Sequence, residues 1–440
     1  MQQYFNQIAD TATQGLQRNE VLTAYVSGED SDFCRFNGAK VRQAGSVKQS
    51  KLELRLIVGR RNAQGELSLS GVRTEDDLRV SQMLSLLRGQ LKQLPEDPYL
   101  LYATDVQSSE QRQVSELPSC AEAISRVVVH AKGLDLVGIY AAGSLYRGFA
   151  NSLGQRNWFE TANFNFDFSL YLRADKAVKT GYGGLVWNEA EFSAKLATAK
   201  AQLAVLNQPA RSIKPGQYRV YLAPQALAEV TEMLGWGGFS LKAQKTKHTP
   251  LLRMIAGGAK MAPSVTMIED TAGGSTANFN DLGYIKPAQV TLIEAGIYRD
   301  ALVSPRSAQE YGVQTNGAGA DESPQSLSLA AGTLAEEQVL PTLRDGIYLN
   351  NLWYLNFSDR PAGRVTGMTR FASFWVEHGE IREPLNVMRF DESLLRLFGD
   401  KLVGLTAKRE MLPSARTYGQ RSLEGSHLPG AIVDDFSFTL

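Results

Sequence analysis

YRVYLAPQALAEVTEMLGWGGFSLKAQK, residues 218–245, combines a short strand with the helix that follows it. Tyr218–Leu222 is an apolar run of strand length, and it predicts a buried strand. Pro224 marks the start of the helix, because proline is tolerated in a first helical turn. Glycines cluster in Gly235–Gly238 and predict where the helix ends.

The predicted helix has few groups that could act in catalysis. A helix that follows a strand in this way often presents catalytic residues on its first turns. Here those turns provide Glu229, Thr231 and Glu232, with no His and no Cys. If the chain descends from enzymes, this pattern indicates that the chemistry has been lost at this helix.

Composition predicts a soluble globular protein of more than one domain. The chain has 440 residues, which is too long for one ordinary core. Hydrophobic residues make up 43% and charged residues 21%. Lys plus Arg and Asp plus Glu both number 46, so the net charge is zero and bulk attraction to nucleic acid or anionic lipid is not expected.

Export and metal binding through cysteine are not expected. The first residues, MQQYFNQIAD, lack a basic leader and an apolar signal core, so a cytoplasmic location is expected. No apolar run approaches the length of a membrane span. Cys34 and Cys120 are too few and too far apart for a disulfide framework or a CxxC zinc site, and two thiols in a reducing compartment are expected.

The first half of the chain mixes helices and strands. Its clearest strand is Phe164–Leu172, in which Phe and Leu alternate strictly with polar residues and Tyr171. We interpret its apolar row as the inner face of an antiparallel sheet. The other predicted helices are residues 4–16, 75–91 with Thr74 as N-cap, 121–132 and 188–206. The other predicted strands are 21–27, 32–36, 52–58 and 134–140, with 144–149 as a turn-like segment.

The second half is predicted to be mostly strands. Ala295-Gly296 and His378-Gly379 each sit between two strand-like runs, where a two-residue hairpin turn needs positive φ. Residues 316–332 are small and polar and predict a mobile loop. Residues 391–398 predict a short helix capped by Asp391, and residues 431–440 a closing strand.

The common catalytic motifs are absent from the sequence. No two of the four histidines, His130, His248, His378 and His427, lie at i and i+4, so no helix offers two imidazoles to one metal in that way. There is no GxSxG and no GxxxxGK[ST]. Glu377 and Glu380 flank a turn and are interpreted as a solvated hairpin tip.

The order of several short segments resembles the TldD/PmbA family, also called modulators of DNA gyrase, and in particular its PmbA (TldE) branch. The resemblance spans nearly the whole chain. It rests on RFNG (35–38), ANSLG (150–154), YRVYLAP (218–224), LIEAGI (292–297), GIY (346–348), TG (366–367) and FWVEHGEI (374–381).

The resemblance implies a metallopeptidase frame without its metal. In the TldD branch, His-Glu-x-x-x-His on the helix after this strand and a distant Cys hold zinc, and the Glu serves as general base on the metal-bound water. Counting from Leu222-Ala223-Pro224 without gaps puts Glu232, Met233 and Gly237 at those three positions. No Cys follows Val403, so no zinc is expected in this chain, only in a TldD-type partner.

Three functions follow as hypotheses. The first is a noncatalytic PmbA/TldE-like subunit, a pseudoenzyme that works with a TldD-like partner on peptides or unfolded segments. The second is an independent peptidase that uses Glu232 with Asp270 or Glu269, or a site around His248. The third is a binding or regulatory protein linked to DNA gyrase, although zero net charge argues against direct DNA binding.

The predicted fold is α+β with two domains. Residues 1–208 are expected to form a mixed sheet with helices. Residues 209–440 are expected to form antiparallel hairpins around the helix at residues 226–234, with a boundary at PARSIKPGQ (209–217). Homodimers are expected when the chain is studied alone, because the surface meant for a partner can pair with itself.

Overall fold

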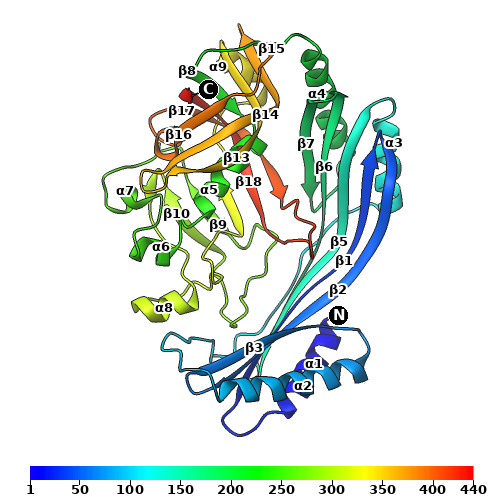
Figure 1. Ribbon diagram of the computed structural model, residues 1–440, viewed down its shortest axis with the longest axis vertical. Coiled ribbons are helices and arrows are strands. Elements are labelled where there is room, and N and C mark those ends of the chain that lie inside the picture. Colours follow the sequence, from blue (N-terminus) through cyan, green and yellow to red (C-terminus); the bar gives the residue numbers. More distant parts are fainter. Residues whose placement is uncertain (440) are drawn as a thin grey trace.

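The computed structural model describes residues 1–439, and it confirms a strand-rich α+β fold built on two sheets (Figure 1). The first sheet has the order β3-β2-β1-β5-β6-β4, with β7 paired to β6. Its strands are β1 (Val21–Asn37), β2 (Lys40–Val58), β3 (Arg61–Ser68), β4 (Ser109–Arg112), β5 (Asp135–Asn151), β6 (Arg156–Arg173) and β7 (Lys176–Gly184).

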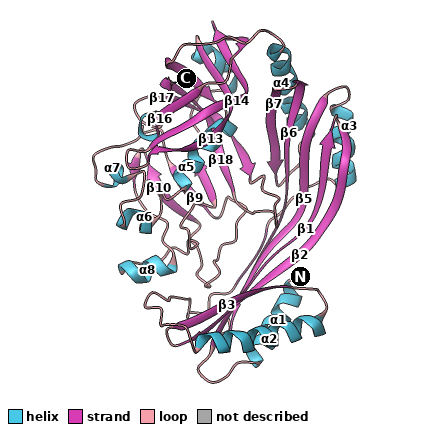
Figure 2. Ribbon diagram, in the orientation of Figure 1, coloured by secondary structure: helices cyan, strands magenta, loops and turns pink. Residues whose placement is uncertain are grey.

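Helices pack on the first sheet at both of its ends (Figure 2). Near β3 lie α1 (Gln2–Gln14) and α2 (Arg73–Leu91), and at the other end α3 (Cys120–His130) contacts β1 and α4 (Glu189–Leu206) contacts β7. The alternating row in β6 is buried, as predicted, with Phe164, Phe166 and Phe168 packed in a core that includes Phe192 of α4. The polar row of β6 therefore faces away from these helices.

The second sheet occupies the C-terminal half. Its strands are β8 (Gly216–Leu222), β9 (Met267–Asp270), β10 (Gln289–Glu294), β11 (Ile297–Tyr298), β12 (Ser326–Leu329), β13 (Gly346–Asp359), β14 (Arg364–Glu377), β15 (Glu380–Pro384), β16 (Arg389–Ser393), β17 (Leu402–Pro413) and β18 (Gly425–Phe438). The order is β11-β10-β9-β12-β18-β16-β14-β13-β8, and β18 also pairs with β8, so part of the sheet closes on itself.

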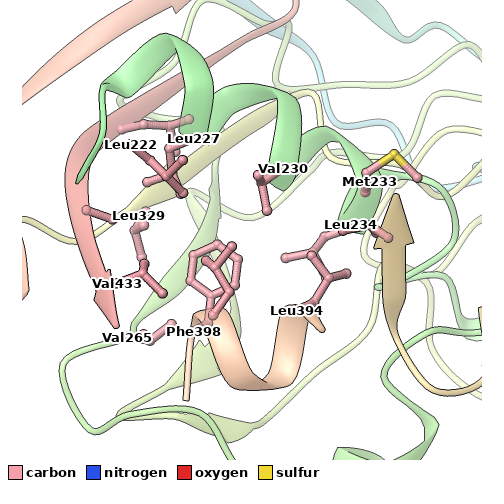
Figure 3. Close-up of a cluster of buried hydrophobic side chains, with 14 of the residues drawn as sticks. Leu222, Leu227, Val230, Met233, Leu234, Val265, Leu329, Leu394, Phe398 and Val433 are labelled. Atoms are coloured by element: carbon pink, nitrogen blue, oxygen red, sulfur yellow. The ribbon is translucent and has the colours of Figure 1, made fainter. Parts of the chain in front are cut away.

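The helices of this half are α5 (Pro224–Gly235), α6 (Leu241–Lys245), α7 (Leu252–Ile255), α8 (Pro305–Tyr311), α9 (Val339–Leu343), preceded by a 3-10 turn at Glu336–Gln338, and α10 (Leu394–Leu397). Figure 3 shows the apolar side of α5 against Val433 of β18 and Phe398 after α10. Because this side is buried, only the residues on the opposite side of α5 lie outside the core. In residues 1–439, no helix is both long and apolar enough to cross a bilayer.

The structure corrects two strand predictions in the first half. Residues 21–27 and 32–36 belong to one strand, β1, and the turn-like segment 144–149 lies inside the continuous strand β5. The polar residues that interrupt the apolar pattern pair across the ladder, with Asp30 opposite Ser144. Glu29 and Ser31 are buried, which shows that the second face of the sheet is also covered here. The residues on this covered face are polar, so the apolar alternation of an ordinary strand is missing.

Three further predictions are wrong in detail. The predicted loop 316–332 contains β12, whose four residues are all buried between β9 and β18. Asp391 pairs opposite Thr366 in the β14–β16 ladder, so it lies in a strand and the helix begins at Leu394. Thr74 is inside α2, whose N-cap residue is Val72. Both predicted glycine hairpin turns are confirmed, with positive φ at Ala295-Gly296 and at His378-Gly379.

Candidate functional site

A cleft of about 1090 Å³ lies where elements of the two sheets meet. The polar row of β6 contributes Asn165 and Asp167, and β7 contributes Lys179. From the other half come α5, the segment 321–325, β17 and the start of β18. The Asn165 side chain donates to the carbonyl of Pro413 at 2.8 Å, which ties the two walls together.

Helix α5 lines the cleft with one face only. The lining residues of this helix and its C-cap are Gln225, Ala228, Glu229, Thr231, Glu232, Gly235 and Trp236. This set follows helical spacing, and the opposite face carries the buried residues Leu227, Val230 and Leu234. The sequence of α5 therefore divides cleanly into a core face and a cleft face.

The three candidate motif positions do not come together in the cleft. Glu232 lines it. Met233 is 2% exposed and packs in the core beneath α5, as Figure 3 shows. Gly237 follows the helix in a left-handed conformation with φ of 83° and does not line the cleft. A register shifted by one residue places Thr231, Glu232 and Trp236 at the same spacing, and all three line the cleft.

Two carboxylates one turn apart dominate the cleft face of α5. Burial, followed by the negative charge of Glu232, raises the pKa of Glu229. Across the cleft, Lys195 of α4 pairs with Glu410 of β17 at 2.6 Å, and Lys179 pairs with Asp167 at 3.4 Å. Lys179 also favours the ionised form of Glu229, and Lys408, Arg409 and Arg416 line the cleft as well, so the cleft presents charges of both signs.

His427 is a cleft residue that the sequence did not assign to the site. It lies in β18 opposite Met411 of β17, and the predicted closing strand began four residues too late to include it. Burial, reinforced by the positive charge of Arg409, lowers the pKa of His427. Both effects favour the neutral imidazole. Pro429 and Gly430 interrupt the strand pattern here, which is why the sequence did not predict that β18 extends this far.

The other histidines lie outside the cleft. His130 Nε2 contacts Glu189 at 2.6 Å, and the His378 ring lies 3.7 Å from Asp345 in a hairpin turn. His248 follows α6, and its backbone N–H donates to the carbonyl of Ala243.

Glu269 and Asp270 each have a structural partner. Glu269 is 6% exposed and accepts hydrogen bonds from the backbone N–H groups of Gln325 and Ser326. Asp270 accepts from the backbone N–H of Gly273. The structure does not bring either of them to Glu232 in the cleft.

The donor set of the cleft does not fit catalytic zinc. Within residues 1–439, no three or more His, Cys, Asp or Glu side chains are grouped so that they could hold a metal ion. Thr231 and Trp236 lack an imidazole, and Met233 is enclosed in the core. Cys34 is buried in the core between β1 and α3, and Cys120 lies at the start of α3.

Comparison with known proteins places the chain among a set of related folds. The model of the family described as PmbA/TldA metallopeptidase C-terminal domain matches residues 215–440. No curated protein sequence matches the chain.

Solved structures match over nearly the whole length. TldE from Thermococcus kodakarensis has a TM-score of 0.77 at 13% identity, covering 99% of this chain and 100% of that one. A candidate modulator of a DNA gyrase from Thermotoga maritima MSB8 has a TM-score of 0.75 at 14% identity, covering 99% and 100%. Another from Bacteroides thetaiotaomicron VPI-5482 has a TM-score of 0.75 at 13% identity, covering 99% and 98%.

Proposed function

Because the chain belongs to the PmbA/TldD metallopeptidase family, we propose that it is a noncatalytic subunit that holds peptide beside a zinc-bearing, TldD-like partner. The observation that carries the proposal is the cleft face of α5. It keeps a carboxylate at Glu232 and offers Thr231 and Trp236 where two imidazoles would be needed.

The shifted register supports this reading better than the ungapped count. In both registers the two positions that hold histidine in the motif carry no imidazole. Only the shifted one, Thr231, Glu232 and Trp236, has all three residues along the cleft, with Thr231 2% exposed and its hydroxyl donating to the Ala228 carbonyl. It also leaves Glu232 where the general base of an active relative would lie. A carboxylate without its metal has no activated water to deprotonate.

The cleft itself supports peptide binding. It is lined by both charged and apolar side chains and is large enough for several residues of an extended chain. Its walls include strands β7 and β17, and extended peptides are commonly held through backbone hydrogen bonds to strands. We therefore assign to this subunit the shaping of a substrate chamber, with bond cleavage supplied by the partner.

Zinc content and peptidase activity of the purified chain test the proposal. We expect no stoichiometric zinc after dialysis against zinc-containing buffer, and no cleavage of casein or unstructured peptides. Cleavage should begin only when a family member with an intact His-Glu-x-x-x-His motif is added. Stoichiometric zinc in the purified chain, or peptide cleavage that is lost on Glu232→Ala, would instead favour an independent peptidase.

A further inference from the structure

A second groove, of about 720 Å³, adjoins the cleft and shares Asp167 and Lys179 with it. It lies on the face of the first sheet opposite α3 and α4, where Val137 and Ile139 of β5 are more than a third exposed. A bound peptide that extends out of the cleft past Lys179 would therefore enter this groove.

Two β-bulges supply side chains to the groove. On β2, the register shift opposite Arg35 and Phe36 leaves Arg42 as the extra residue. On β14, the shift opposite Leu349 and Asn351 falls at Phe371, which has φ of 59°. Bulges redirect side chains and recur beside functional sites.

The conformation of Phe371 is costly for the fold. A left-handed backbone is unfavourable for a residue with a Cβ, and glycine would remove that cost. The Phe371 ring instead stands at the groove, with Lys179 Nζ 5.9 Å and the Arg370 guanidinium 5.4 Å from the ring centroid. Backbone strain of this kind is typical of sites that bind something.

The groove carries excess positive charge. Among its described lining residues, the cations are Arg35, Arg42 and Lys179, and the one carboxylate is Asp167. Asp167 is already paired with Lys179 at 3.4 Å. The two arginines, which come from neighbouring strands and are exposed, remain available to an anionic ligand.

We propose that this groove binds an acidic, extended segment of the same peptide whose neighbouring residues occupy the cleft. The inference deepens the proposed function and rests on it for the presence of a peptide. Single-stranded nucleic acid would also suit cations beside an aromatic ring. Peptide is favoured because the groove continues into a cleft lined by seven carboxylates against five Lys and Arg, a mixed and slightly acidic surface that disfavours a uniformly charged phosphate backbone.

Fluorescence anisotropy on the isolated chain tests the groove. The probes are a labelled, unstructured Glu-rich peptide, the same peptide with Gln in place of Glu, and a labelled single-stranded oligonucleotide. The variants are Arg35→Gln/Arg42→Gln and Phe371→Gly. Arg18→Gln is the control, because this exposed arginine between α1 and β1 does not line the groove.

We expect the Glu-rich peptide to bind more tightly than the Gln peptide and to lose affinity in salt. The double arginine variant should weaken it roughly tenfold, since exposed ion pairs contribute up to about 1 kcal/mol each. Phe371→Gly should weaken binding while leaving thermal stability unchanged or higher, a combination that a purely structural role would not give. Arg18→Gln should bind as the unaltered chain does.

Equal affinity for the Glu and Gln peptides, or affinity unchanged in both groove variants, would overturn the inference. So would tighter binding of the oligonucleotide through the same arginines. The assay uses neither partner nor metal, so it remains decisive if the chain proves to bind zinc or to cleave peptides alone. Zinc binding or independent cleavage would refute the proposed function but would leave the inference about the groove unchanged.

Discussion

At the scale of single residues, α5 separates what sequence can predict from what it cannot. The strand, the proline and the terminal glycines located the helix, and Pro224–Gly235 agrees with that prediction. The rotation of the helix was not predictable from an ungapped count, because a one-residue shift moves every side chain by about 100° around the axis. Only the packing of Met233 against the core shows which residues face the cleft.

Imidazoles introduced on the core face and on the cleft face of α5 should therefore have different effects on stability. Met233→His puts a polar ring into a site that is 2% exposed, and we expect a loss of about 2–5 kcal/mol in the free energy of unfolding. Trp236 is 45% exposed, and Trp236→His should cost less than about 1 kcal/mol. Urea denaturation measures the free energy of unfolding of both variants. Equal losses in the two would show that Met233 does not lie on the core face of α5.

The Glu229 carboxyl should make stability depend on pH. Its pKa is raised by burial and by Glu232, so the folded protein binds more protons than the unfolded chain between the ordinary and the raised pKa. Stability must then fall as pH rises through that interval. We expect Glu229→Gln to raise the thermal midpoint at neutral pH and to flatten this part of the profile. Glu75→Gln, at an exposed site on α2, should keep the unaltered slope.

At the scale of elements, the strongly alternating strand was predictable and the polar strands were not. In β6 the apolar row meets helices and the polar row meets the cleft, which is why both rows are so regular. In β12 the residues Ser326–Leu329 carry little β signal, yet they are buried between two strands. Pairing with strands that are distant in the sequence decides whether such a segment forms a strand, and the local sequence does not contain that information.

The segment beside β12 depends on one buried carboxylate. Glu322 is 1% exposed and accepts hydrogen bonds from the Ser240 hydroxyl, the Lys242 N–H and the Ser304 N–H, which lie at the first turns of α6 and α8. Glu322→Ala should lower the free energy of unfolding by about 2–4 kcal/mol. The exposed neighbouring substitution Asp321→Asn should change it by less than about 0.5 kcal/mol. Similar values for the two in urea titrations would contradict this role.

At the scale of the whole molecule, the sequence indicated an α+β fold and a family but could not show how the two halves meet. Ala372 and Phe374 of β14 share a core with Phe164 of β6. The segment between β17 and β18 reaches back to the first sheet, where Arg421, 5% exposed, donates to the Ser31 hydroxyl and to the carbonyls of Gly143 and Asn163. These contacts join residues more than 200 positions apart.

Removing this guanidinium should loosen the cleft. Arg421→Met leaves buried acceptors without a donor, and we expect a loss of about 3 kcal/mol with faster hydrogen exchange in residues 414–424. Arg416→Met changes an exposed arginine of the same segment and should alter neither. Unchanged exchange in the Arg421 variant would show that other contacts hold the two halves together.

We propose that this chain retains a metallopeptidase frame while the chemistry belongs to a partner. The most direct test combines the purified chain with a TldD-like subunit from the same organism and measures peptide cleavage with Glu232→Gln in this chain. We expect activity within about twofold of the unaltered complex, because only an interaction that stabilises the transition state changes the rate by orders of magnitude. Loss of activity in that variant, or zinc-dependent cleavage by this chain alone, would contradict it.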